Sequence, residues 1–501
     1  MRKIPATMAT QHPDNAGAPF WDDGRPFIGV HEEIHEAVAC FRDLNVGEYM
    51  WDWEGKHADA AVIDRLFSDY HEYFSQHQLG RDQFLTFRLP NIWEEKGYNL
   101  LQAMTVILSS EDFARDLKFN NRPLFEIILP MTERADQLIH MQKLFQKVAK
   151  FKSTEFTKDN ETNTDYLEII PLVESVESQL AVDDLLREFV SLHDKNFGKK
   201  PEYIRAFLAC SDSALTSGLL AGIIGNKVAL SRLQEFTKES GIPTYPILGA
   251  GSLLFRGGLA PDTLDRFTKE FAGVRTVTVQ SAFRYDYPEV IVKKAITRLE
   301  KDLPHIKPHV IDPFDQSELI IIGKTASKYY KQSLDSIVKD LNKVFEAVPK
   351  RRDRRQHIGL LAYSRTTGTH TLPRAITFTA SLYSIGIPPE FIGLGRALRD
   401  LKPEQIELLR QEYANISSDF EKAGRYYNEN NLEELIKQNS AWRDIKTDFE
   451  IAKKILEIQL GPKSSDEHAH KELSSALVSS KYQTEMTKLI TEMAGLRKSL
   501  G

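Results

Sequence analysis

Two acidic residues stand directly after two strand-like apolar runs near the middle of the chain. The run 166–173 is followed by Glu174, and the run 203–211 is followed by Asp212. A helical pattern lies between the runs, and a right-handed strand–helix–strand crossover brings both carboxylates to the same edge of a parallel sheet. One such acid would merely cap the next helix. Two of them predict a site for a hard divalent ion such as Mg²⁺.

Arginines follow four of the strand-like runs, at Arg88, Arg256, Arg284 and Arg365. The planar guanidinium suits carboxylate and phosphate groups, and its charge does not titrate away. Each arginine alone is more often a solvated surface residue. Together with two acids, the four predict a pocket for a small, highly anionic substrate. Glycines on both sides of Arg256 let backbone amides approach an anion and let this segment move as a lid.

His12 lies in an irregular N-terminal segment and precedes Pro13. Proline favours an extended backbone for the residue before it, and a histidine held in this way can act as a general base, although an exposed loop histidine is the plainer alternative. His31 and His35 fit the H-E-x-x-H pattern of zinc proteases, but the motif is short and has no evident third ligand. An ordinary amphipathic helix is favoured there.

Eight strand-like runs alternate with helical patterns, and they must position these residues. The runs lie at 46–53, 84–89, 123–130, 166–173, 203–211, 244–255, 275–283 and 358–364. Most are separated by roughly thirty to forty residues, the repeat of a β/α unit, and eight units close a barrel whose active site lies at the carboxyl ends of the strands. The sequence therefore predicts an α/β fold, a (β/α)8 TIM barrel with additional N-terminal, inserted and C-terminal helices.

The rest of the chain is assigned around this barrel. We expect one domain over 1–501, with an N-terminal segment 1–45 that carries His12 and a barrel over 46–371 with a helical insertion at about 287–357. The last part, 372–501, is almost entirely helical in pattern, and we expect it to pack on the barrel and at a subunit interface.

Composition excludes several other classes of protein. The net charge of −6 argues against a general nucleic-acid binder, and no apolar run approaches the ~20 residues that span a bilayer. The basic run 350–355 is predicted to be a solvated connection. Two cysteines, Cys40 and Cys210, cannot form a disulfide framework, so we expect a reduced, cytoplasmic compartment.

Several of these segments resemble the signature segments of the phosphoenolpyruvate carboxylase family. They are Ala9-Thr-Gln-His-Pro13, Ile170-Pro-Leu-Val-Glu174, Ser211-Asp-Ser-Ala214, Arg256-Gly-Gly258, Ser364-Arg365 and Leu372-Pro-Arg-Ala-Ile376. The segments Met50-Trp-Asp-Trp-Glu-Gly-Lys56 and Gln280-Ser-Ala-Phe-Arg-Tyr-Asp286 are similar to the archaeal-type branch of that family. The resemblance spans nearly the whole chain.

The resemblance implies a carboxy-lyase that forms oxaloacetate and phosphate from phosphoenolpyruvate and bicarbonate. The reaction would run through carboxyphosphate and a metal-stabilised enolate and would supply four-carbon dicarboxylic acids. It also implies a homotetramer. Glu174 and Asp212 would hold Mg²⁺ or Mn²⁺. The implied catalytic residues are His12, Arg256 and Arg365, and the implied substrate-binding residues are Arg88, Arg284 and Arg374.

The chain departs from the larger members of the family in two places. They carry a lysine where this chain has Leu215, and Lys56 or Arg205 could supply the missing cation. They also end in a Gln-Asn-Thr-Gly tail that takes part in inhibition by aspartate, whereas this chain ends Ser-Leu-Gly501, so that regulation is not carried over.

Two other functions fit the same residues. One is another barrel lyase that handles a metal-bound enolate, for example by cleaving a 2-hydroxy dicarboxylate. The other is a non-catalytic barrel that senses an anionic metabolite, although a sensor has no need of a general base such as His12.

Overall fold

The computed structural model describes residues 2–19, 28–54, 58–94, 97–119, 121–156, 167–349, 365–367 and 370–501. For residues 30, 365–367, 370 and 371 the description covers the backbone alone.

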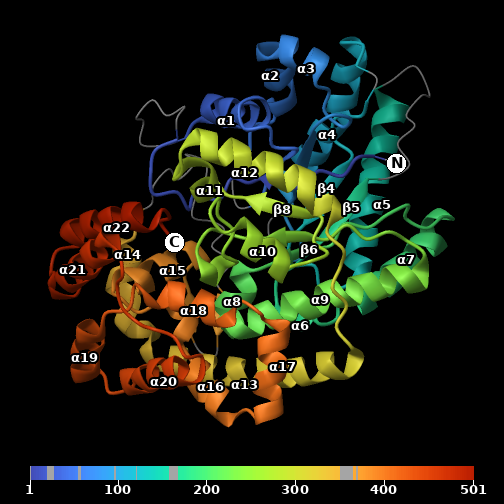
Figure 1. The fold of residues 1–501 in the computed structure, drawn as a ribbon. Helices are drawn as coiled ribbons and strands as arrows, with labels where there is room; N and C mark the ends of the chain where they lie inside the picture. The colour runs from blue at the N-terminus through green and yellow to red at the C-terminus, as the bar shows by residue number, and fades with distance from the viewer. Residues whose placement is uncertain are drawn as a thin grey trace.

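Eight parallel strands close a barrel in chain order, with helices packed around it (Figure 1). The last strand, β8, pairs with the first, β1, so that Thr7 lies beside Val277 and Ala9 beside Val279. The predicted (β/α)8 barrel is therefore confirmed. The strands are β1 Thr7–Ala9, β2 Glu48–Asp52, β3 Phe84–Arg88, β4 Glu126–Leu129, β5 Glu168–Val173, β6 Phe207–Ala209, β7 Ile247–Gly249 and β8 Thr276–Val279.

The strand prediction is wrong at the two ends of the barrel. The first strand is Thr7–Ala9, within the segment that was expected to precede the barrel, and the predicted seventh strand is the last one, β8. The predicted eighth strand, 358–364, lies outside the described residues, and the barrel closes without it. A strand of three residues is too short for its apolar pattern to be recognised.

The helices around the barrel follow from their apolar stripes. In α2, for example, Val62, Ile63, Leu66 and Phe67 are buried on one face. The helices between the strands and directly after the last strand are α1 Val30–Arg42, α2 Val62–Asp69, α3 His71–Gln76, α4 Tyr98–Asp116, α5 Ala135–Glu155, α6 Val176–Gln179, α7 Val182–Phe197, α8 Ser211–Ser217, α9 Leu219–Ser240, η1 Leu254–Arg256, α10 Leu264–Glu270, α11 Ser281–Tyr285 and α12 Glu289–Asp302.

The helices predicted as an insertion follow the last strand of the barrel instead. The first of them, α12, packs into the barrel core, whereas those from α13 onward join the C-terminal helices in a second apolar core. Its large buried side chains include Trp442, Phe449 and Phe391. In Figure 1 these helices gather on one side of the barrel, and α13 packs along α9. The helices after α12 are η2 Leu303–His305, α13 Pro313–Ile337, η3 Val338–Leu341, α14 Asn342–Ala347, α15 Ala375–Ser384, η5 Pro389–Phe391, α16 Leu394–Asp400, α17 Pro403–Glu412, α18 Ile416–Gly424, α19 Glu429–Gln438, α20 Trp442–Ile455, α21 Ser465–Ser479 and α22 Gln483–Arg497. Strands β9 Arg365–Thr367 and β10 His370–Leu372 pair in antiparallel fashion. The assignment of the chain to one domain stays a prediction.

A buried ion network occupies the amino-terminal end of the barrel. Arg205 donates to Glu48, the first residue of β2, at 2.6 Å and to Glu126, the first residue of β4, at 2.7 Å. Tyr203 donates to the same Glu126 at 2.6 Å. The side chains of Arg205 and Glu48 have no solvent exposure. Since this end lies opposite the carboxyl ends of the strands, Arg205 cannot supply the cation that is missing at Leu215.

Replacing Arg205 by Met should destabilise the protein strongly. The change leaves Glu48 and Glu126 buried without their cation, which costs about 3–5 kcal/mol of unfolding free energy. Urea unfolding at a fixed protein concentration measures this. Arg298→Met is the matched control, because Arg298 is 47% exposed in its ion pairs and such pairs contribute little. Equal losses in the two variants would contradict the structural role of the network.

Candidate active site

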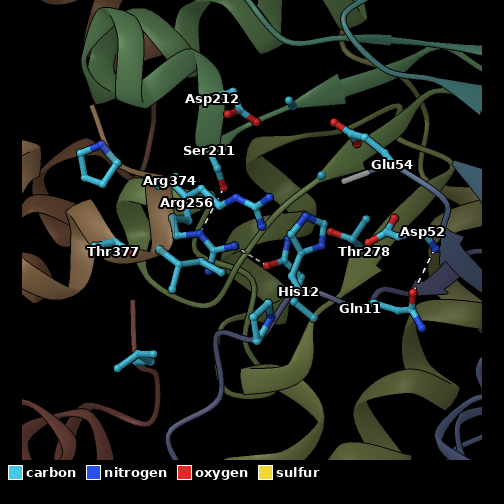
Figure 2. Close-up of a pocket in the computed structure, with 18 of the residues that line it drawn as sticks. Gln11, His12, Asp52, Glu54, Ser211, Asp212, Arg256, Thr278, Arg374 and Thr377 are labelled. Atoms are coloured by element: carbon cyan, nitrogen blue, oxygen red, sulfur yellow. Dashed lines mark hydrogen bonds between the residues drawn. The ribbon is translucent and has the colours of Figure 1, made fainter. Parts of the chain in front are cut away.

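A cavity of about 640 Å³ opens at the carboxyl ends of the strands, where barrel enzymes place their active sites. The ends of barrel strands supply Asp52, Glu54, Glu174, Asp212 and Arg88, and the segment after β1 supplies His12. Glu346 comes from α14 and Arg374 from the start of α15. Figure 2 shows His12, Arg256, Arg374 and Asp212 around one space. The charged and catalytic candidates that line it are His12, Asp52, Glu54, Arg88, Glu174, Asp212, Arg256, Glu346 and Arg374.

Glu174 and Asp212 lie at the ends of the neighbouring strands β5 and β6 and line the same cavity. Glu174 directly follows β5, and Asp212 is in the first turn of α8, one of the short helices that follow β6. Two carboxylates at one rim fit Mg²⁺ or Mn²⁺, which bind hard oxygen ligands. Within the described ranges, groups of three or more metal-ligating side chains are not found. An ion held by two carboxylates keeps other octahedral positions for oxygen atoms of water and substrate.

Arg88 is a cation held in place by two other acids of the cavity. Its Nε lies 2.8 Å from Asp52 Oδ1 and 2.9 Å from Glu54 Oε2. Burial lowers the pKa of Arg88, but the two carboxylates more than reverse this effect. The guanidinium thus stays charged and faces an anion-binding cavity with a fixed orientation.

His12 is held as a neutral imidazole. Its Nδ1 lies 2.9 Å from Thr10 Oγ1, and its backbone carbonyl accepts a hydrogen bond from Ser281 Oγ at 2.5 Å. Burial is the main cause that lowers the pKa of His12 to about 3, and the neighbouring Arg88 lowers it further. The neutral imidazole can accept a proton, but a pKa this low makes it a weak base. An anionic substrate bound in the cavity would raise the pKa of His12 and so strengthen it as a base.

The loop that carries Arg256 is closely tied to the rest of the site. Gly251 and Gly257 pair across it, and Gly257 has φ of +114°, a conformation that favours glycine. The Phe255 N–H donates at 3.0 Å to Glu390, a buried residue of η5. Burial raises the pKa of Glu390 to about 7. The second apolar core therefore holds the Arg256 loop through its backbone.

The side chain of Arg256 is almost fully buried and lies between Ser211 and His12 (Figure 2). Its Nε donates to Ser211 Oγ at 3.2 Å, and one terminal nitrogen donates to Asp14 Oδ2 and to the Gly501 backbone oxygen, each at 2.7 Å. The other terminal nitrogen donates to Gln280 Oε1. These contacts fix the direction in which the guanidinium meets the cavity.

The last residues of the chain reach the site, which sequence reasoning missed. Leu500 lines the cavity, and its N–H donates to the Asp14 backbone oxygen at 2.8 Å. Gly501 is buried against Ile376, where a Cβ would lie 2.1 Å from the backbone oxygen. A missed strand-end residue is Gln280, which directly follows β8 and accepts from Arg256. Its position after a strand was the available signal.

The structure gives different outcomes for the remaining predicted arginines. Arg374 lines the cavity from the start of α15. For Arg365, in β9, only the backbone is described. Arg284 is buried behind the site, is not among the residues that line the cavity, and donates to Thr10 O and Glu36. This placement does not support the prediction that Arg284 binds substrate.

Two minor candidates are also placed by the structure. His31 and His35 lie on α1, outside the cavity, as the interpretation as an ordinary helix predicts. Lys56, the second candidate for the missing cation, lies outside the described residues. No helix in the described part of the chain is both long and apolar enough to cross a membrane.

The fold and the cavity together define a (β/α)8-barrel enzyme for a small anionic substrate, with acids, arginines and a neutral histidine at one rim. A family model described as phosphoenolpyruvate carboxylase matches residues 4–501. The chain belongs to the phosphoenolpyruvate carboxylase family, which confirms the resemblance.

Relatives that carry the name of this family are similar in sequence to the whole chain. Proteins named phosphoenolpyruvate carboxylase from Leuconostoc mesenteroides and Oenococcus oeni are 53% and 51% identical, each over 100% of this chain and 99% of the relative. One from Metallosphaera sedula is 37% identical over 100% of both chains. The Metallosphaera sedula protein is thus similar to this chain along its full length.

The low pKa of His12, which is half-buried and lines the cavity, should make the protein less stable in acid. The unfolded pKa is near 6.5 and the folded pKa about 3, so below pH 6.5 the unfolded chain binds a proton that the folded chain does not. The contribution of neutral His12 to the free energy of unfolding is fully present above pH 6.5 and is lost as the pH falls toward 3. Between pH 7 and pH 5 the loss is at most about 2 kcal/mol, and water that enters the cavity reduces it.

Urea unfolding of wild type and His12→Gln at pH 7 and pH 5 tests this effect. The variant should lose less unfolding free energy between the two pH values than the wild type does. His77→Gln is the control, because His77 is exposed and its replacement should leave the wild-type pH dependence. An unchanged pH dependence in His12→Gln would show that His12 titrates normally.

Proposed function

We propose that this chain catalyses the carboxylation of phosphoenolpyruvate by bicarbonate, giving oxaloacetate and phosphate and so supplying four-carbon dicarboxylic acids. The observation that carries the proposal is the meeting of His12, Arg256, Glu174 and Asp212 in one cavity of a chain that belongs to this family. Each of these residues has chemistry that the reaction needs.

Glu174 and Asp212 would hold Mg²⁺ or Mn²⁺. When bound, this ion would attract the anionic substrate and offset the negative charge that develops during the reaction. Arg88 and Arg374 would bind the phosphate and carboxylate groups of the substrate, since both line the cavity and guanidinium groups match such anions. The catalytic role of Arg365 is inferred from the family resemblance alone.

The first step would join bicarbonate to phosphorus. A bicarbonate oxygen attacks the phosphoryl group, the bond between phosphorus and the enol oxygen breaks, and carboxyphosphate and the enolate of pyruvate result. Arg256 would neutralise the phosphoryl charge during this transfer, because its guanidinium is fixed at the cavity wall by Ser211 and Gln280.

In the second step, His12 would take the carboxyl proton of carboxyphosphate. Loss of this proton breaks the bond between carbon and the bridging oxygen and releases CO₂ and phosphate beside the enolate. The enolate carbon then attacks CO₂ and forms oxaloacetate. The contact of Nδ1 with Thr10 leaves Nε2 of His12 as the nitrogen that can face the reacting group.

We also infer a homotetrameric, cytoplasmic enzyme without nucleic-acid or membrane partners. Exposed apolar side chains on the outer helices support assembly, for example Leu101 at 58% and Tyr98 at 55% exposure on α4. Both cysteines are buried and free, which fits a reducing compartment.

Replacing His12 by Asn should separate phosphate release from carboxylation. With Mg²⁺ or Mn²⁺, wild type should form oxaloacetate and phosphate in equal amounts, and only when bicarbonate is present. His12→Asn should still release phosphate but leave pyruvate, because carboxyphosphate then keeps its proton and CO₂ is not delivered to the enolate. Coupled assays for oxaloacetate, pyruvate and phosphate measure the three products.

His77→Asn, at an exposed helix end, should behave as wild type. If wild type binds phosphoenolpyruvate but turns nothing over with either metal, the protein is a sensor and the proposal fails. Cleavage of a 2-hydroxy dicarboxylate without bicarbonate would instead identify the other lyase.

The two acids should be required for metal binding. Glu174→Gln and Asp212→Asn should each weaken Mn²⁺ binding by about tenfold or more, since charged oxygen ligands dominate the affinity of such sites. Electron paramagnetic resonance of free Mn²⁺ measures this without turnover. Glu346→Gln removes a charge at the same cavity and should bind Mn²⁺ as wild type does. Wild-type binding in both site variants would place the metal elsewhere.

A further inference from the structure

Asp14 is a buried carboxylate beside the site that the proposed mechanism does not use. The residue has no solvent exposure and is not among the residues that line the cavity. It stands two positions after His12, and its N–H donates to the His12 carbonyl at 3.1 Å. Whatever holds Asp14 therefore also holds the backbone of the proposed base.

The two oxygens of Asp14 bind two different elements. Oδ1 accepts the Ala282 N–H of α11 at 2.8 Å, and Oδ2 accepts from Arg256 at 2.7 Å. The side chains of Asp14 and Arg256 are 0% and 2% exposed. A charge-assisted hydrogen bond in such a dry place is strong and has a fixed direction.

Asp14 is the acidic side chain among the partners of Arg256. The others are the Ser211 hydroxyl, the Gln280 side-chain oxygen and the Gly501 backbone oxygen. Arginine has a long, flexible stem, so the Ser211 hydroxyl and the Gln280 amide oxygen restrain it less than a buried carboxylate does. Among the side chains that contact the guanidinium, Asp14 thus supplies the strongest electrostatic restraint.

We propose that Asp14 is a positioning residue that fixes the guanidinium of Arg256 relative to His12. It touches neither substrate nor metal, but it links the proposed base and the proposed phosphoryl-binding cation within one rigid unit. The inference rests on the proposed roles of His12 and Arg256. Its consequence is that the two groups keep their spacing while phosphate leaves and CO₂ is captured.

The substitution Asp14→Asn tests the charge with little change of shape. An asparagine has one acceptor and one donor group where the aspartate has two acceptors. In one orientation the asparagine oxygen accepts the Ala282 N–H, and its NH₂ group faces the N–H donors of Arg256. In the other orientation the oxygen accepts from Arg256, and the NH₂ group faces the Ala282 N–H. One of the two contacts is lost in either orientation, and the restraint on Arg256 is weakened.

The experiment is a double-mutant cycle of Asp14→Asn and Arg256→Gln. It measures kcat and the share of released phosphate that is accompanied by pyruvate instead of oxaloacetate. Asp14→Asn should lower kcat by about tenfold or more and raise the pyruvate share, and Arg256→Gln should change both in the same direction. The double variant should lie within about twofold of Arg256→Gln, because a residue that acts through Arg256 has no further effect once Arg256 is gone.

Asp286→Asn is the matched control. Its carboxylate accepts the Ala16 and Gly17 N–H groups at 2.7 and 2.6 Å, so it holds the same N-terminal segment, but it is not a partner of Arg256. This variant should keep kcat and the product ratio of the wild type. A loss equal to that of Asp14→Asn would mean that any anchor of the segment has this effect, and the proposal would be wrong.

The remaining outcomes are also decisive. Wild-type behaviour of Asp14→Asn, or losses that multiply in the double variant, would overturn the proposal. If Asp14→Asn does not fold, Asp14→Ser replaces it in the double-mutant cycle, because the serine hydroxyl can accept from the Ala282 N–H without placing an amide against Arg256. If neither variant folds, Asp14 has a structural role and the proposal is wrong. Arg256→Gln with wild-type turnover would refute the role of Arg256, and absence of oxaloacetate in wild type would refute the proposed function itself.

Discussion

The pairing of β1 with β8 is the contact on which the rest of the structure depends. It closes the barrel and brings residues 7–9 beside 276–279, about 270 positions away in the chain. Because both strands end at the same rim, the segment that follows β1 lies against α11, which follows β8. Ser281 then holds the carbonyl of His12, and Ala282 holds Asp14. The position of the base is thus a result of barrel closure.

Burial of opposite charges side by side sets the chemistry of the rim. Arg88 is fixed by Asp52 and Glu54, so it contributes a constant positive charge near His12. This charge and the dry surroundings keep the imidazole neutral, while the same cavity stays attractive to anions. Binding of an anionic substrate and readiness of a base therefore arise from one arrangement of charges.

The helices outside the barrel complete the site from the other side. Arg374 at the start of α15 and Leu500 after α22 line the cavity, and Glu390 holds the backbone of the Arg256 loop. Leu500 belongs to the second apolar core, and Arg374 and Glu390 lie on elements that contribute to it; this core packs on the barrel, with α13 along α9. A change in the packing of this core would be transmitted to Arg256, since its loop is bound to both parts.

The sequence by itself determined the barrel class, the two acids at adjacent strand ends, the arginines near the rim and the family, because apolar periodicity and ordered motifs are local signals. Only the tertiary structure decided that Thr7–Ala9 is the first strand, that Arg284 lies behind the site and that Asp14, Gln280 and Gly501 surround Arg256. A short strand has no readable period, and the partner of a buried charge is set by contacts between residues that are distant in the chain. The fold creates those contacts, and no local pattern records them.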